Sequence, residues 1–254
     1  MTDTRDLGDS AFRMHTARER RVEMTYGGAL SFLRRKYTRD LTGVDVAVMG
    51  VPYDSAVTNR PGCRLGPRAI REASTQLAEL NAFPWGFDLL TSLGIVDFGD
   101  CFIDPHHPLG VAETIEAQAR AILDTGSKLL TLGGDHFIAY PLLKAHAAKH
   151  GPLALIQVDA HGDLWPDDPG RIDHGTMMGR AIAEGIVDAS KSTQVGIRTY
   201  HDSTQGLDVL TAPFIHREGI GAAIQRCVDR AGDAPVYLSF DIDALDPAFA
   251  PATG

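Results

Sequence analysis

The stretch "VDVAVMGV", residues Val44–Val51, is followed after a loop by "GPRAIREASTQLAEL", residues Gly66–Leu80. The first stretch is a short apolar run bounded by Gly50 and Pro52, which predicts a buried strand. The second stretch places Pro67 in its first turn and repeats apolar residues at helical spacing, which predicts an amphipathic helix. The residues expected on its apolar face are Ile70, Ala73, Leu77 and Leu80. A strand followed by a helix is the repeating unit of α/β folds.

The same alternation continues along the chain. Further strands are predicted over 94–100, 128–132, 153–158, 193–197 and 236–240, with another within 208–215, and further helices over 109–125 and 219–231. We therefore predict a three-layer α/β fold, with a central, mostly parallel sheet and helices on both faces. No repeat, low-complexity tract or change of composition divides the sequence, so residues 1–254 are expected to form a single domain with 1–25 as an N-terminal arm.

Composition and charge exclude several classes of protein. The 254 residues carry a formal net charge of −9, which argues against non-specific binding to nucleic acid. No apolar run reaches the roughly 20 residues that a membrane span needs, and the N-terminus lacks the apolar segment of a signal peptide. The three cysteines, Cys63, Cys101 and Cys227, are widely spaced, which favours a reducing compartment over a disulfide framework. We expect a cytoplasmic protein, with Cys227 in the core.

Acidic residues and histidines follow three of the predicted strands. "GGDHF" follows the strand at 128–132, "DAHGD" follows 153–158 and "DIDALDP" follows 236–240. Ligands of open α/β sheets bind at the carboxyl ends of the strands, so these side chains are expected to meet at one edge. In an extended chain, residues two apart point to the same side. The expected set is His136, Asp159, His161, Asp163, Asp241 and Asp243.

Four carboxylates and two imidazoles predict a metal site. Carboxylates packed together without cations repel one another, and divalent cations remove that repulsion. Carboxylate with imidazole suits Mn²⁺, and Fe²⁺, Co²⁺ and Ni²⁺ have similar chemistry, whereas the absence of thiolates weakens the case for structural zinc. Calcium prefers oxygen ligands without histidine. Two neighbouring metals can lower the pKa of a shared water and create a nucleophile near neutral pH.

These motifs resemble those of the ureohydrolase superfamily, which includes arginase and agmatinase. The resemblance runs from about Tyr26 to Gly254 and rests on "GGDHF", "DAHGD", "DHGTMM" and "SFDIDALDPAFAPATG". The motifs "GVPYD", "FPWGFD" and "VGIRT" look closest to the agmatinase family. The resemblance implies an arginase-like fold, two Mn²⁺ per subunit and hydrolysis of agmatine to putrescine and urea. It also implies a homo-oligomer, a trimer or hexamer, and a small cationic guanidino substrate.

The resemblance also implies a role for each site residue. His136 and Asp163 are expected to bind one manganese, and His161 and Asp243 the other. Asp159 and Asp241 are expected to bridge the two metals. His174, in "DHGTM", matches the histidine that passes a proton to the leaving amine, a step that imidazole chemistry suits. A hydrogen bond that orders a loop is the alternative for His174.

The substrate is less well defined than the metal site. Trp165 stands where arginases carry asparagine, which argues against an amino-acid substrate, and Gly162 replaces a common threonine. Guanidinobutyrase or guanidinopropionase activity remains an alternative, with Arg171 as the nearby basic candidate for a substrate carboxylate. Asp167, Asp168 and Asp173 are loop acids that could meet a substrate amine, and Asn59 and Arg60 lie in a loop near the site in this family.

Two other classes of function stay open at this point. The sequence stops at "PATG", before the glutamate-containing run, central strand and final helix with which the superfamily continues. We therefore expect the C-terminus to be truncated, and a metal-binding but inactive scaffold is an alternative to an enzyme. A two-metal phosphohydrolase would use similar ligands, but no Gly-rich phosphate cradle or arginine cluster accompanies the motifs.

Overall fold

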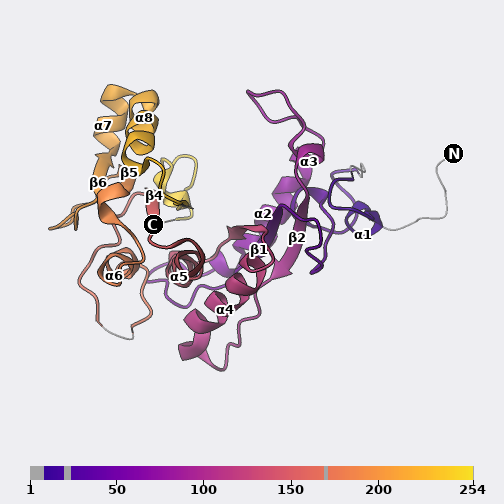
Figure 1. The fold of residues 1–254 in the computed structure, drawn as a ribbon, viewed down its shortest axis with the longest axis horizontal. Coiled ribbons are helices and arrows are strands. Elements are labelled where there is room, and N and C mark those ends of the chain that lie inside the picture. The colour runs from indigo at the N-terminus through magenta and orange to yellow at the C-terminus, as the bar shows by residue number, and fades with distance from the viewer. Residues whose placement is uncertain (1–8, 20–23, 169–170, 254) are drawn as a thin grey trace. The chain divides into compact units, whose positions relative to one another are not determined.

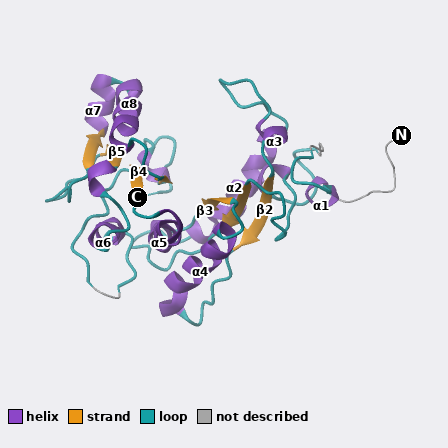
Figure 2. Ribbon diagram, viewed as in Figure 1, coloured by secondary structure: helices purple, strands orange, loops and turns teal. Residues whose placement is uncertain are grey.

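The computed structural model describes residues 9–19, 24–168 and 171–253. By the contacts between its residues, the chain divides into two compact units. The first comprises 1–53, 62–106 and 117–134, and the second comprises 54–61, 107–116 and 135–254. Helices and strands alternate in both units, as Figures 1 and 2 show. None of the helices in the described ranges has the length and apolar character that a membrane crossing requires.

The first unit contains a sheet of three parallel strands in the order β2-β1-β3. These strands are β1 (Val46–Gly50), β2 (Ile95–Asp100) and β3 (Lys128–Leu132). The accompanying helices are α1 (Ser10–Arg13), α2 (Gly66–Ser74) and α3 (Leu89–Ser92), and α4 (Val111–Leu123) contributes residues to both units. Val48, Leu90 and Ile95 form a core cluster that strand β1 shares with its neighbours. The predicted strand at 44–51 and helix at 109–125 are confirmed within two residues.

Helix α2 differs from its prediction in length and in orientation. It ends at Ser74 and continues as a 3₁₀ turn, Thr75–Leu77, and both Ile70 and Leu77 are exposed. The buried face instead carries Arg71, whose guanidinium binds Asp97 at 2.8 and 3.0 Å and Asp100 at 2.6 Å. The periodicity of apolar residues therefore identified the wrong face of the helix. An arginine can be buried when carboxylates replace the hydrogen bonds that it would make with water.

The second unit contains a sheet of four parallel strands in the order β6-β5-β4-β7. These strands are β4 (Ala154–Val158), β5 (Thr193–Ile197), β6 (Asp208–Thr211) and β7 (Val236–Phe240). The helices are α5 (Ala139–His150), α6 (Met177–Ala183), α7 (Ala212–Glu218) and α8 (Ile220–Ala231). Figure 1 shows α7 and α8 on one side of this sheet and α5 and α6 on the other. The α/β class and the parallel pairing are therefore confirmed, with the described strands in two sheets.

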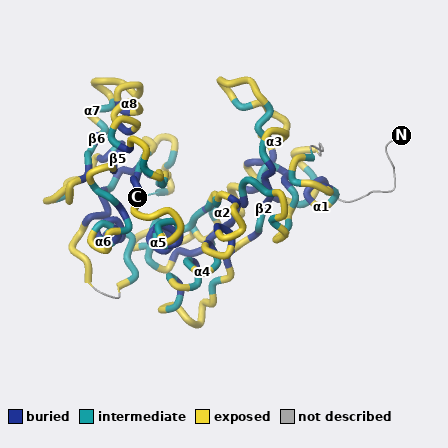
Figure 3. Tube along the Cα trace, viewed as in Figure 1, coloured by how far each residue is buried: buried dark blue, intermediate teal, exposed yellow. Residues whose placement is uncertain are grey.

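One core cluster of the second unit lies between its sheet and helix α8. Val195 and Leu210 pack with Ala223 and Cys227, which confirms the core position predicted for Cys227. Figure 3 shows that α8 also carries exposed residues, and Ile224 in this helix is 57% exposed. The strand predicted within 208–215 ends at Thr211, because the Thr211 hydroxyl accepts a hydrogen bond from the amide of Phe214 and so caps α7.

Candidate metal centre

The six residues predicted to bind metal come together in the second unit. His136 starts a 3₁₀ turn, His136–Ile138, that leads into α5. The residues of "DAHGD" follow β4, and Asp241 and Asp243 follow β7. Because β4 and β7 are neighbouring parallel strands, their carboxyl ends bring both motifs to the same edge. We expected the ends of separate strands to supply one site, and β4 and β7 do so.

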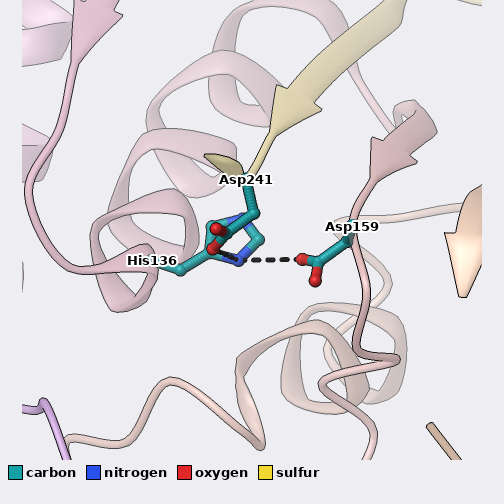
Figure 4. A group of neighbouring side chains, drawn as sticks. All are labelled: His136, Asp159 and Asp241. Carbon is teal, nitrogen blue, oxygen red and sulfur yellow. Dashed lines mark ion pairs between the residues drawn. The ribbon is translucent and has the colours of Figure 1, made fainter. Parts of the chain in front are cut away.

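Two groups of side chains each have the geometry of a metal site. His136, Asp159 and Asp241 form one group, and Asp159, His161 and Asp243 form the other, with possible ligand atoms within 4.8 Å of one another in each. Figure 4 shows the first group, with ion pairs from one ring nitrogen of His136 to the carboxylates of Asp159 and Asp241. Asp159 belongs to both groups and is 1% exposed. A carboxylate with one oxygen on each side is suited to join two cations.

Three carboxylate oxygens surround one ring nitrogen of His136. His136 Nδ1 lies 3.1 Å from Asp159 Oδ2, 3.1 Å from Asp163 Oδ2 and 3.2 Å from Asp241 Oδ2. Asp163 thus contacts His136, although it belongs to neither of the two groups found among the described residues. On the far side of the ring, His136 Nε2 and Ser239 Oγ are 2.7 Å apart, and this contact fixes the ring plane.

The second group is more open to solvent. His161 Nδ1 lies 2.8 Å from Asp243 Oδ2 and 3.7 Å from Asp159 Oδ1. The side chain of His161 is 43% exposed, whereas that of Asp243 is 9% exposed. A ligand from solvent therefore reaches this group through the His161 side.

Tight turns, and not extended strands, aim the aspartates. Asp159 Oδ1 accepts a hydrogen bond from the amide of His161 at 2.7 Å, and Asp241 Oδ1 accepts one from the amide of Asp243 at 3.0 Å. Asp163 has a φ of +52°, a left-handed conformation that aspartate adopts more readily than most residues. The convergence predicted from alternating strand positions is correct, but the reason given for it is wrong. The aspartate side chains cap turns that follow the strands.

The charges of the site shift the pKa values of its members. Burial raises the pKa of Asp163 to about 6. Burial would lower the pKa of His136, but hydrogen bonds to Asp159, Asp163 and Asp241 raise it well above its usual range. Hydrogen bonds to Asp159 and Asp243 raise the pKa of His161 to about 10. In the metal-free protein these imidazoles are therefore cations that offset the carboxylates, and the donor set fits divalent cations in their place.

This shift predicts how the metal-free protein responds to pH. The pKa of His161 rises from about 6.5 in an unfolded chain to about 10 in the fold. Its stabilising contribution is therefore complete below about pH 6.5 and disappears as the pH rises through about 10. In the presence of chelator, the unfolding temperature of the wild type is expected to fall relative to that of His161→Asn between these limits. Parallel pH profiles for the two proteins would contradict this assignment.

His174 lies outside both groups and pairs with Asp135. His174 Nδ1 is 3.6 Å from Asp135 Oδ2, and the Asp135 side chain is fully buried. Asp135 Oδ1 accepts a hydrogen bond from the amide of Phe137 at 2.8 Å, while Oδ2 has no hydrogen-bond partner among the described residues. The interaction with Asp135 raises the pKa of His174. His174 is therefore half-buried and lies beside a buried carboxylate that favours its protonated form.

Other candidates from the sequence have partners outside the two ligand groups. Asp167 accepts two hydrogen bonds from Arg180, at 2.6 and 2.8 Å. Arg171 Nε lies 3.0 Å from Asp173 Oδ2. Arg60 donates to the backbone carbonyl of Pro251 at 3.0 Å. Asp167, Arg171 and Asp173 thus each have an ion-pair partner within the chain.

Sequence reasoning missed four residues that support the site: Asp135, Gln157, Gln194 and Ser239. Gln157 and Ser239 lie within predicted strands, immediately upstream of the ligand motifs. A polar residue inside an apolar strand beside such a motif was the available signal for both. Gln194 lies 31 residues beyond Asp163, so no local pattern connects it to the site.

Known proteins resemble this chain along most of its length. The model of the Arginase family matches residues 44–254. A protein named agmatinase from Chromobacterium violaceum is 54% identical over 256 aligned residues, which cover 100% of this chain and 80% of that protein. Among solved structures, a hypothetical agmatinase from Burkholderia thailandensis has a TM-score of 0.95 at 54% identity, covering 97% of this chain and 78% of the other. Proclavaminate amidino hydrolase from Streptomyces clavuligerus has a TM-score of 0.82 at 34% identity, with coverage of 91% and 79%.

Proposed function

Because this chain belongs to the arginase family, we propose that it hydrolyses agmatine to putrescine and urea with two Mn²⁺ ions. The observation that carries the proposal is that Asp159 belongs to both groups of carboxylate and imidazole ligands. The relative from Chromobacterium violaceum, which covers the whole chain, supports the choice of agmatine. Assembly into a trimer or hexamer stays a prediction from the family resemblance, and a cytoplasmic location stays a prediction from the sequence.

The ligand roles follow the two groups. His136, Asp159 and Asp241, with Asp163 beside them, would hold one ion, and Asp159, His161 and Asp243 would hold the other. Bridging of the two ions by Asp241 as well as Asp159 stays a prediction from the family resemblance. A bound pair of divalent ions lowers the pKa of water and supplies a nucleophile at neutral pH. In the metal-free chain, hydrogen bonds to His136 and His161 outweigh burial and lower the pKa of Asp159, whereas burial raises the pKa of Asp163.

His174 supplies the second requirement of the reaction. An alkylamine leaves a tetrahedral carbon readily only after it has gained a proton. The contact with Asp135 raises the pKa of His174, which favours the protonated imidazole that can donate that proton. Asp135 lies beside Nδ1 of His174, so the proton would be donated from Nε2, the other ring nitrogen.

The choice between agmatine and 4-guanidinobutyrate rests on charge. A substrate that ends in a carboxylate requires a basic group, and the basic candidate from the sequence, Arg171, pairs with Asp173. The net charge of −9 also favours a cationic substrate. With Mn²⁺ present, kcat/KM measured by urea release is expected to be at least about tenfold higher for agmatine, the equivalent of about 1.4 kcal/mol.

The same assay separates the alternatives. Equal or reversed preference between the two substrates would contradict the agmatine assignment and support guanidinobutyrase activity. Mn²⁺ binding without urea release from either compound would support the inactive scaffold. Arg171→Ala is a matched test of the charge argument, because it is expected to leave the preference for agmatine unchanged.

A further inference from the structure

Two glutamines lie side by side beneath the candidate metal centre. Gln157 on β4 and Gln194 on β5 are partners in the parallel pairing of the two strands. Both residues are 0% exposed. A buried primary amide is costly unless it is hydrogen-bonded, so the partners of these side chains indicate why they are present.

The Gln157 amide nitrogen faces the metal-binding loop. It donates to Asp159 Oδ2 at 2.8 Å and lies 3.2 Å from Asp163 Oδ2 and 3.3 Å from the carbonyl oxygen of His161. It therefore contacts the carboxylate shared by both groups and the carboxylate beside His136. Packing alone would not place three acceptors around one nitrogen.

Gln194 fixes the orientation of Gln157. The Gln194 amide nitrogen donates to Gln157 Oε1 at 2.8 Å and to the carbonyl oxygen of Gly162 at 2.6 Å. Rotating the Gln157 amide by 180° would place its oxygen against two carboxylates and its nitrogen against the nitrogen of Gln194. The network thus allows one orientation of Gln157, with its donors toward the aspartates.

The side-chain oxygen of Gln194 indicates that this residue is present for the hydrogen bonds that its nitrogen donates. Gln194 Oε1 is buried and has no hydrogen-bond partner among the described residues. An apolar side chain of similar shape would fill the same space without an unpaired carbonyl. Gln194 is therefore better explained by the two bonds that its nitrogen donates than by packing.

From these contacts we propose that Gln157 and Gln194 form an amide relay that positions Asp159 and Asp163 for metal binding. A neutral donor holds the carboxylates in place without neutralising them, whereas lysine or arginine would compete with the metal for their charge. Gln157 acts on the carboxylates directly, and Gln194 acts on them by fixing the orientation of Gln157. The proposal rests on the proposed metal-dependent function and adds the residues that set its metal affinity.

The test compares Mn²⁺ binding by the metal-free wild type with binding by Gln157→Met and Gln194→Met. Methionine keeps the length of the side chain and removes both donors. Loss of a group that orients a metal ligand weakens metal affinity about 10- to 100-fold, and Gln157→Met is expected to fall in this range. Gln194→Met is expected to have a smaller effect, and the double variant is expected to match Gln157→Met, because both residues act through one contact.

Ser192→Ala serves as the matched control. Ser192 is also fully buried between β4 and β5, where its hydroxyl accepts from the amide of Leu155 at 2.8 Å and donates to the carbonyl of Asp188 at 2.7 Å. This variant is expected to lower the unfolding temperature while leaving the Mn²⁺ dissociation constant unchanged. The comparison separates loss of stability from loss of ligand positioning.

The outcomes distinguish the relay from the proposed function. Unchanged Mn²⁺ affinity and an unchanged EPR spectrum of the bound ions in Gln157→Met would overturn the relay, as would additive effects in the double variant. If the wild type binds Mn²⁺ but releases no urea, the proposed function fails and the affinity comparison still decides the relay. If the wild type does not bind Mn²⁺, both are overturned.

Discussion

Replacement of Asp159 with asparagine is expected to reduce urea release by about a thousandfold or more and to prevent binding of a complete metal pair. Asp159 is the member that the two candidate groups share, with Oδ2 toward His136 and Oδ1 toward His161. Asparagine has nearly the same shape but lacks the second anionic oxygen. Metal ions supply several kcal/mol of transition-state stabilisation, and each 1.4 kcal/mol is about tenfold in rate.

The measurement is urea release together with bound manganese per chain. Asp246→Asn is the control, because Asp246 is exposed and accepts a hydrogen bond from the amide of Ala248 at 2.8 Å, as a turn residue does. Asparagine supports such a turn equally well, so wild-type activity is expected. Two manganese ions and normal turnover in Asp159→Asn would show that Asp159 does not join the sites.

Replacement of His174 with asparagine is expected to lower kcat by about 10²- to 10⁴-fold, the usual contribution of a positioned acid. Metal content is expected to remain at the wild-type level, because His174 belongs to neither candidate group. KM should change little, since the proton moves only as the amine leaves. The direct readout is steady-state kinetics of urea release with Mn²⁺ quantified in the same samples.

A role in ordering the loop would give a different result. In that case the His174→Asn protein would lose stability or manganese and keep its kcat per bound metal pair. His216→Ala, at an exposed position in the last turn of α7, controls for the removal of a surface imidazole. Retention of wild-type kcat by His174→Asn would contradict the acid role.

The sequence was most informative where a motif and a strand coincide. "DAHGD" and "DIDALDP" each follow a strand, and parallel strands end at the same edge, so their convergence could be predicted. The turns that aim the aspartates could not, because they depend on hydrogen bonds between side chain and backbone. Gln157 and Gln194 were missed since a single glutamine in a strand resembles any other polar residue until its cross-strand partner is known.

Helix prediction failed for α2 and α5, because neither helix has apolar residues along the whole length of its buried face. Arg71 occupies the inner face of α2 because Asp97 and Asp100 satisfy it, and those partners are distant in sequence. Helix α5 escaped prediction because its buried residues, Ala139 to Ala145, lie together in its first two turns. They do not repeat along one face, so the helical period is not visible.

Titration of the metal-free protein with Mn²⁺, with urea release from agmatine measured at each step, tests the central claim most directly. No urea is expected without metal, and the rate is expected to reach its maximum when two ions are bound per chain, one for each group around Asp159. Urea release by the metal-free protein, or a maximum rate at one bound ion per chain, would contradict a two-metal centre.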